Sequence, residues 1–233
     1  MAAPRRGDHS TGRSGRGLAT GTSFVDDMTS IHRNASAALA VLLALFAPSA
    51  WAHGTIAGIN QFYNGVLHPL VAPAHLLSLL ALALLAGQQG LRPRPVEIIG
   101  LAGGYLLGAA SAFQAGDPDT DAWLWAFTLG VGAAVALART QSTWLRAATG
   151  AAVGLAIGLG SADVALQEGR RVAALLGAGF GALILISYAA LAVDTIRRRI
   201  RHPAAAIAVR VLGSWLTACA VLMLALAWKK SQG

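Results

Sequence analysis

Three histidines gather at the first long apolar run of the chain. His53, His68 and His75 lie in the stretch SAWAHGTIAGINQFYNGVLHPLVAPAHLLSLLALALLAG, which covers residues 49 to 87. Imidazole is a natural ligand for nickel, cobalt, zinc and copper, whereas magnesium and calcium prefer oxygen ligands. Polar groups are costly beside hydrocarbon, so those that remain there tend to face a cavity or a functional path. The pattern predicts a site for a transition-metal ion.

The spacing of His68 and His75 requires a particular backbone if both are to bind one ion. Seven residues place them on one face of a regular helix but about 10.5 Å apart along its axis. Pro69 and Pro73 disfavour a regular helix, because proline removes a donor and biases its predecessor away from helical geometry. A break there would fold His68 back toward His75. In the alternative, His53 only follows a cleavage site and the other two histidines cap or hydrogen-bond helix ends.

A carboxylate could complete the metal site. Asp163 follows the fourth long apolar run after residue 70 and lies on the same side of the membrane as the histidines in the topology predicted below. In the alternative, Asp163 and Glu168 are solvated loop residues or pair with Arg170 and Arg171. The one cysteine, Cys219, lies inside an apolar run, which excludes disulfides and thiolate metal sites.

Other acidic residues have mainly local interpretations. Glu97 is expected to cap its helix, with a role in an exit path as the alternative, and Asp194 to offset the arginines that follow it. In the loop QAGDPDTD, Asp119 or Asp121 is expected to cap the next helix. The alternative for that loop is an acidic surface that concentrates cations.

The composition indicates a membrane protein. The 233-residue chain is 55% hydrophobic and only 12% charged, whereas a soluble domain has roughly 25% charged residues. The net charge of +8 comes from arginines in short loops, which argues against nucleic acid as a partner. No H-E-x-x-H motif and no G-x-S-x-G motif with a histidine partner is present, so no enzyme is predicted. The expected partners are the lipid bilayer and a metal ion, and a homo-oligomer stays open.

The N-terminal part contains no predicted element of the mature fold. Residues 1–27 are rich in Gly, Ser and Arg, which predicts a disordered or untranslated extension with Met28 as the true start. Residues 28–52 combine a basic start, an apolar stretch and an A-x-A site, the pattern of a signal peptide. Cleavage after Ala52 would let His53 chelate through its α-amine and ring together. The alternative is an uncleaved first transmembrane helix.

Residues 53–233 are predicted to form a single all-α domain, a bundle of about six transmembrane helices. Each apolar run is long enough to cross a hydrocarbon core of about 30 Å; the runs cover residues 71–87, 96–113, 122–138, 144–160, 172–193 and 204–228. Glycines at four-residue spacing predict close helix packing in three of them: Gly100, Gly104, Gly108, Gly150, Gly154, Gly158, Gly177 and Gly181.

The distribution of arginines predicts the orientation. Loops one, three and five are basic, whereas loops two and four have only Arg170 and Arg171; the basic loops contain Arg92, Arg94, Arg139, Arg146, Arg197, Arg198, Arg199 and Arg201. The positive-inside rule places the basic loops in the cytoplasm. Both ends of the mature chain are therefore predicted outside the bacterial inner membrane.

The residues around the histidines resemble the HupE/UreJ family. The matching features are the pair His68-Pro69 and the run His75-Leu76-Leu77, after a signal peptide and ahead of a six-span chain rich in Gly and Ala. Ala74 stands where the family has an aspartate. The later histidine-rich motif of the family has no counterpart in GLAIGLGSADVALQEG.

The resemblance implies a nickel or cobalt permease that works alongside hydrogenase or urease, with metalloenzyme maturation proteins as further partners. The first hypothesis is a transporter that captures a divalent ion through outer His53, His68, His75 and Asp163. The second is a membrane-anchored accessory, chaperone or sensor protein that binds the ion without moving it. Zinc and copper stay open as alternative ions.

Overall fold

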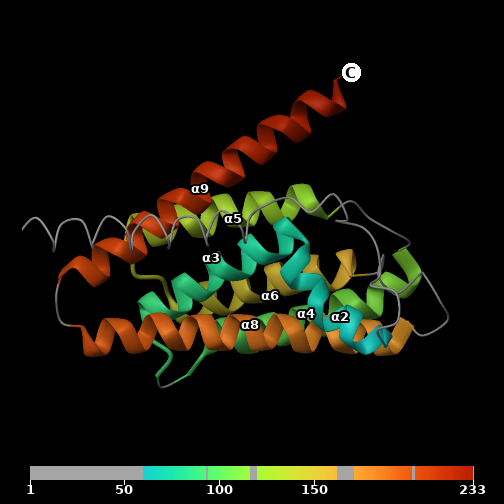
Figure 1. Ribbon diagram of the computed structural model, residues 1–233, viewed down its shortest axis with the longest axis horizontal. Helices are drawn as coiled ribbons and strands as arrows, with labels where there is room; N and C mark the ends of the chain where they lie inside the picture. The colour runs from blue at the N-terminus through green and yellow to red at the C-terminus, as the bar shows by residue number, and fades with distance from the viewer. Residues whose placement is uncertain (1–59, 93, 116–119, 162–170, 201–202, 233) are drawn as a thin grey trace, which may run out of the picture. The chain divides into compact units, whose positions relative to one another are not determined.

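The computed structural model describes residues 60–92, 94–115, 120–161, 171–200 and 203–232, which all belong to the unit Ala52–Gly233. These residues form seven helices and no strand (Figure 1): α2 (Gln61–Val71), α3 (Pro73–Gln89), α4 (Val96–Ala115), α5 (Asp121–Ala136), α6 (Thr143–Gly160), α8 (Arg171–Arg199) and α9 (Pro203–Ser231). The predicted extension, signal peptide and cleavage site lie outside the described residues.

Each of the six predicted apolar runs contains a helix, from α3 to α9. By length and composition, α8 and α9 can each cross a membrane, and the bent pair of α2 and α3 can form a third span. Two shorter apolar helices, Val96–Ala112 and Asp121–Ala136, accompany them. The structure is therefore that of a helical protein with candidate membrane spans, and the number of six stays a prediction.

The polar segment before the first run is helical. It forms α2, whose Gln61 and Asn64 are buried. The reason is tertiary packing. A side chain at Gly65 would meet the backbone of α8, and a side chain at Gly177 or Gly181 would meet the backbone of α2. The two backbones therefore lie in direct contact, and α8 covers one face of α2.

α3 lies at the centre of the helices and contacts all six others that the structure describes. Its sequence LLSLLALALLAG is apolar on every side, which is typical of a helix without a solvent-facing stripe. Leu79, Leu82 and Leu85 are completely buried. α3 thus forms the core, and it carries His75 in its first turn.

The predicted glycine ridges join α4 to α6. Side chains at Gly100, Gly104 and Gly108 would meet α6 backbone, and side chains at the facing glycines Gly150, Gly154 and Gly158 would meet α4 backbone. Such small residues let helices approach closely in lipid, where van der Waals packing drives association. The prediction of close packing is confirmed for this pair and for α2 with α8.

Candidate functional site

The break between α2 and α3 brings the two histidines together. The two helices are bent by 71°, and Ala72 between them is extended with φ −84° and ψ 110°. The rings of His68 and His75 lie 4.8 Å apart, centre to centre, at an interplanar angle of 82°. The expected approach of His68 to His75 is therefore present. Its cause is Pro73, the first residue of α3, because the helix of α2 continues through Pro69.

The separation of the rings suits a shared ion. A metal bound by both would lie about 2.0–2.1 Å from one nitrogen of each ring, as zinc does, which requires ring centres within about 6 Å of each other. The observed separation of 4.8 Å meets this condition. The edge-on arrangement further prevents stacking of the two ring faces. The pair can therefore supply two nitrogen ligands to one ion.

His75 is buried without full hydrogen bonding. Its side chain is 3% exposed, and its Nδ1 has no hydrogen-bond partner among the described residues. Nearby polar groups of the same region are satisfied: Tyr105 donates to the Leu175 carbonyl at 2.5 Å, and the Ser161 hydroxyl donates to the Ile157 carbonyl at 2.7 Å. A buried polar atom without a partner costs about 1–3 kcal/mol, so His75 calls for an explanation that packing does not give.

The other nitrogen of His75 lies beside the end of α6, which Thr120 also approaches. A side chain at Gly160, the last residue of α6, would lie 3.1 Å from His75 Nε2 and would also meet the Thr120 hydroxyl. Thr120 stands at the start of α5 and is 4% exposed. We call this region, formed by the α2–α3 break, the start of α5 and the end of α6, the histidine end.

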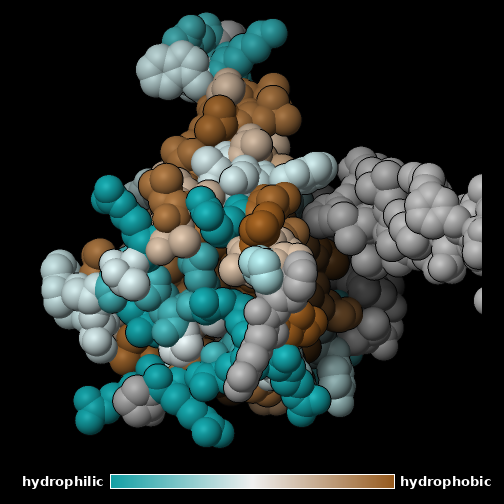
Figure 2. Space-filling view, turned by 90° about the vertical axis from the view of Figure 1, so that its left-hand side faces the viewer, coloured by the Kyte–Doolittle hydropathy of each residue, from teal (hydrophilic) through white to brown (hydrophobic). Residues whose placement is uncertain are grey.

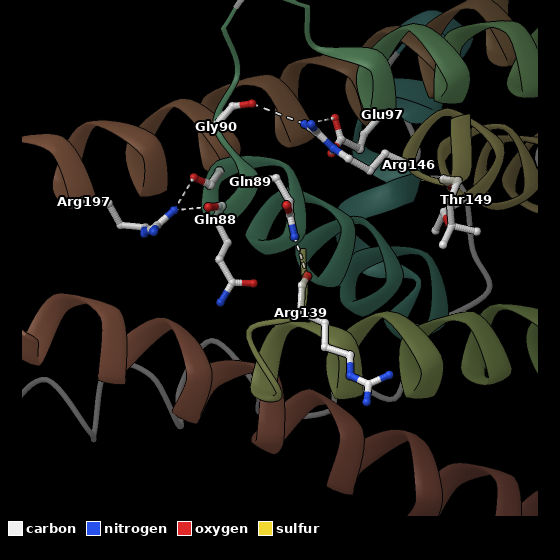
Figure 3. Close-up of polar contacts among 10 residues, drawn as sticks. Gln88, Gln89, Gly90, Glu97, Arg139, Arg146, Thr149 and Arg197 are labelled. Carbon is white, nitrogen blue, oxygen red and sulfur yellow. Dashed lines mark hydrogen bonds and ion pairs between the residues drawn. The ribbon is translucent and has the colours of Figure 1, made fainter. Parts of the chain in front are cut away.

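The opposite ends of the same helices form a basic region, which we call the arginine end. There Arg146 donates to Glu97 at 2.5 and 3.0 Å and to the Gly90 carbonyl at 3.2 Å (Figure 3). Arg197 donates to the Gln88 carbonyl, and Gln89 donates to the Arg139 carbonyl at 2.6 Å. Hydrophilic side chains gather on this face (Figure 2). The network joins α3, α4, α5, α6 and α8.

Comparison with known families decides the relationship. A family model described as HupE / UreJ protein matches residues 40–223. The chain belongs to the HupE/UreJ family. No curated protein and no solved structure matches it. Membership of the HupE/UreJ family implies involvement in handling nickel or cobalt for hydrogenase or urease.

The structure describes only some of the ligands expected for this HupE/UreJ protein. The structure brings His68 and His75 together, whereas His53 and Asp163 lie outside the described residues. Among the described residues, no group of three His, Cys, Asp or Glu side chains could hold a metal ion. Ala74, in the place of the family aspartate, is a buried core residue at 2% exposure. The described part of the site is thus an imidazole pair.

Thr120 and Gly160 were missed by sequence reasoning. Gly160 follows Gly158 by two residues, which turns it about 200° around the helix, away from the glycine ridge. Helix packing through that ridge therefore does not explain Gly160. A glycine outside the ridge could have indicated that another segment approaches the helix at this position. Thr120 gave no such signal. The expected cap by Asp119 or Asp121 stays a prediction, because Thr120 occupies the N-cap position, Asp121 is the first residue of α5 and Asp119 lies outside the described residues.

Proposed function

We propose that this HupE/UreJ protein transports a divalent ion, nickel or cobalt, across the bacterial inner membrane, with His68 and His75 as its ligands. The observation that carries the proposal is the imidazole pair at the break of a candidate membrane span, with rings 4.8 Å apart. Ionisable residues at such positions are costly and generally serve a function. An ion bound by both rings would give His75 Nδ1 the partner that it lacks among the described residues.

A small number of protein ligands suits transport. An ion must bind well enough to enter and weakly enough to leave. Two neutral imidazoles bind a borderline divalent ion without the strong attraction of several carboxylates. His53 and Asp163 are proposed as additional ligands on the outer side, where cleavage after Ala52 would add the α-amine of His53. Metalloenzyme maturation proteins are the proposed recipients on the cytoplasmic side.

Uptake of radiolabelled nickel and cobalt by cells tests the proposal. We compare the wild type with His68→Ala and His75→Ala, and use His202→Ala as the control, because His202 lies in the predicted basic loop far along the sequence from the pair. Expression in the membrane is matched by immunoblot. Uptake should fall to background in the first two variants and stay at the wild-type level in the control. Equal uptake by wild type and His75→Ala would contradict the proposed ligand role.

The second candidate is an accessory or sensor protein that binds the ion without moving it. It is favoured by the dense network at the arginine end, where Arg146 holds Glu97 and the Gly90 carbonyl at once. Purified protein reconstituted into liposomes distinguishes the two functions. Ion accumulation inside the liposomes supports transport, whereas stoichiometric binding without accumulation would establish the accessory function.

A further inference from the structure

Thr120 and His75 both approach the space that a side chain at Gly160 would occupy. A side chain at Gly160 would contact both the Thr120 hydroxyl and, at 3.1 Å, His75 Nε2. The hydroxyl and the ring nitrogen therefore border one glycine Cα atom. Because any other residue would push them away, glycine at position 160 is what permits this approach.

The Thr120 hydroxyl is not used as a helix cap. Threonine at this position usually accepts a hydrogen bond from an amide of the first turn. Here Thr120 has helical backbone angles, φ −88° and ψ −7°, and makes no side-chain cap bond. Its side chain is nevertheless buried, at 4% exposure. A buried hydroxyl that leaves its helix uncapped is free to serve the neighbouring imidazole, since buried polar groups are rarely without a partner.

The two nitrogens of His75 differ in their surroundings. A neutral imidazole has one N–H donor and one acceptor, and only the acceptor nitrogen can bind a metal. The hydrogen bond made by the other nitrogen decides which one this is. Nδ1 is buried without a hydrogen-bond partner among the described residues, whereas Nε2 lies on the side of Thr120. The asymmetry selects Nδ1 for the ion.

We propose that Thr120 is a positioning residue, whose hydroxyl accepts the Nε2 proton of His75 over Gly160 and so directs Nδ1 to the metal ion. The proposal rests on the proposed metal-ligand role of His75. It assigns functions to two residues that lie 45 and 85 positions away from that histidine in the sequence. A hydroxyl orients the ring without adding charge, which keeps the site weakly binding.

Cobalt binding to the purified full-length protein in detergent tests the assignment. Affinity is measured by titration calorimetry, and ligand geometry by the visible absorption of bound Co²⁺. Thr120→Val should weaken binding by about 10- to 100-fold, the usual effect of removing a group that orients a metal-binding histidine, and should change the spectrum. Thr120→Ser should restore both. The matched control is Thr128→Val on the same helix, because the Thr128 hydroxyl donates to the Leu124 carbonyl; it should bind like the wild type.

Gly160→Ala provides an independent variant, because the added methyl would separate Thr120 from His75 without removing either group. It should reproduce the loss of affinity and the spectral change. Wild-type affinity and spectrum in Thr120→Val, together with lost binding in His75→Ala, would overturn the positioning role alone. Unchanged binding in His75→Ala would overturn the histidine site and the positioning role with it. Binding that depends on Thr120, without ion flux in liposomes, would support the positioning role and reject transport.

Discussion

Glu97 at the arginine end and His75 at the histidine end are both buried, at 0% and 3% exposure, but their surroundings differ. Glu97 receives two hydrogen bonds from Arg146, which also binds the Gly90 carbonyl. His75 Nδ1 receives none from the described residues. A buried carboxylate with a guanidinium partner is a structural element, whereas a buried imidazole with an orphan nitrogen is available to a ligand. The contrast separates the region that holds the helices together from the region that we propose binds the ion.

The comparison is tested most severely by removing one member of the buried ion pair. Arg146→Ala leaves the Glu97 carboxylate buried and unpaired, which should lower the free energy of unfolding by about 3–5 kcal/mol. The control is Arg198→Ala, because its pair with Asp194 is exposed on the arginine side at 55% and should contribute less than about 1 kcal/mol. Denaturation of both variants in detergent measures the difference. Equal losses would mean that Glu97 does not depend on Arg146.

The histidine end should gain stability only when an ion binds. Nickel at 100 times its dissociation constant should stabilise the protein by about 2.7 kcal/mol. The stabilisation should disappear in a His68→Ala, His75→Ala double variant and persist in His202→Ala. Thermal unfolding with and without nickel measures it. A shift of the same size in the double variant would place the ion elsewhere.

The packing of α4 against α6 connects the two ends and should tolerate no side chain at its glycines. Gly104→Ala places a methyl group against the α6 backbone at Ala151, which should lower the free energy of unfolding by about 1–3 kcal/mol. Gly103→Ala is the matched control in the same helix, because a side chain there meets nothing within 4 Å. Unfolding of the two variants in detergent distinguishes them. If Gly103→Ala loses as much, backbone propensity and not packing explains the effect.

The smallest effect on stability is expected at His75, the proposed ligand. His75→Leu removes the unpaired Nδ1 together with the hydrogen bond proposed between Nε2 and the Thr120 hydroxyl, and the two effects on stability oppose each other. The free energy of unfolding should therefore stay within about 1.5 kcal/mol of the wild-type value, the net contribution of one hydrogen bond, while cobalt binding is lost. A loss as large as that of Arg146→Ala would show that His75 supports the fold.

The helices of this protein were largely predictable from sequence, because each apolar run corresponds to one helix. The pairing of Asp194 with a following arginine was also predicted and is confirmed by its hydrogen bond from Arg198 at 2.8 Å, four residues on. The partner of Glu97 was not predicted, because Arg146 lies 49 residues away in the sequence and only the packing of α4 on α6 brings the two side chains together. The prediction that Glu97 caps its helix overlooked this ion pair.

Only part of the candidate site was predictable, because some of its residues are brought together by local sequence and others by helix packing. The break that joins His68 to His75 follows from local proline chemistry, although Pro73 and not Pro69 produces it. Thr120 and Gly160 come from other helices, and their approach to His75 depends on how α3, α5 and α6 pack. No local pattern encodes that packing.

X-ray absorption at the nickel edge tests the central claim most directly, because it reports the atoms that surround the ion. Wild-type protein in detergent with one equivalent of nickel should show the outer-shell scattering of at least two imidazoles. The histidine contribution should fall by one ring in His68→Ala and by one ring in His75→Ala. A nickel environment without imidazole scattering, or one that neither substitution changes, would contradict the assignment of this pair as the metal site.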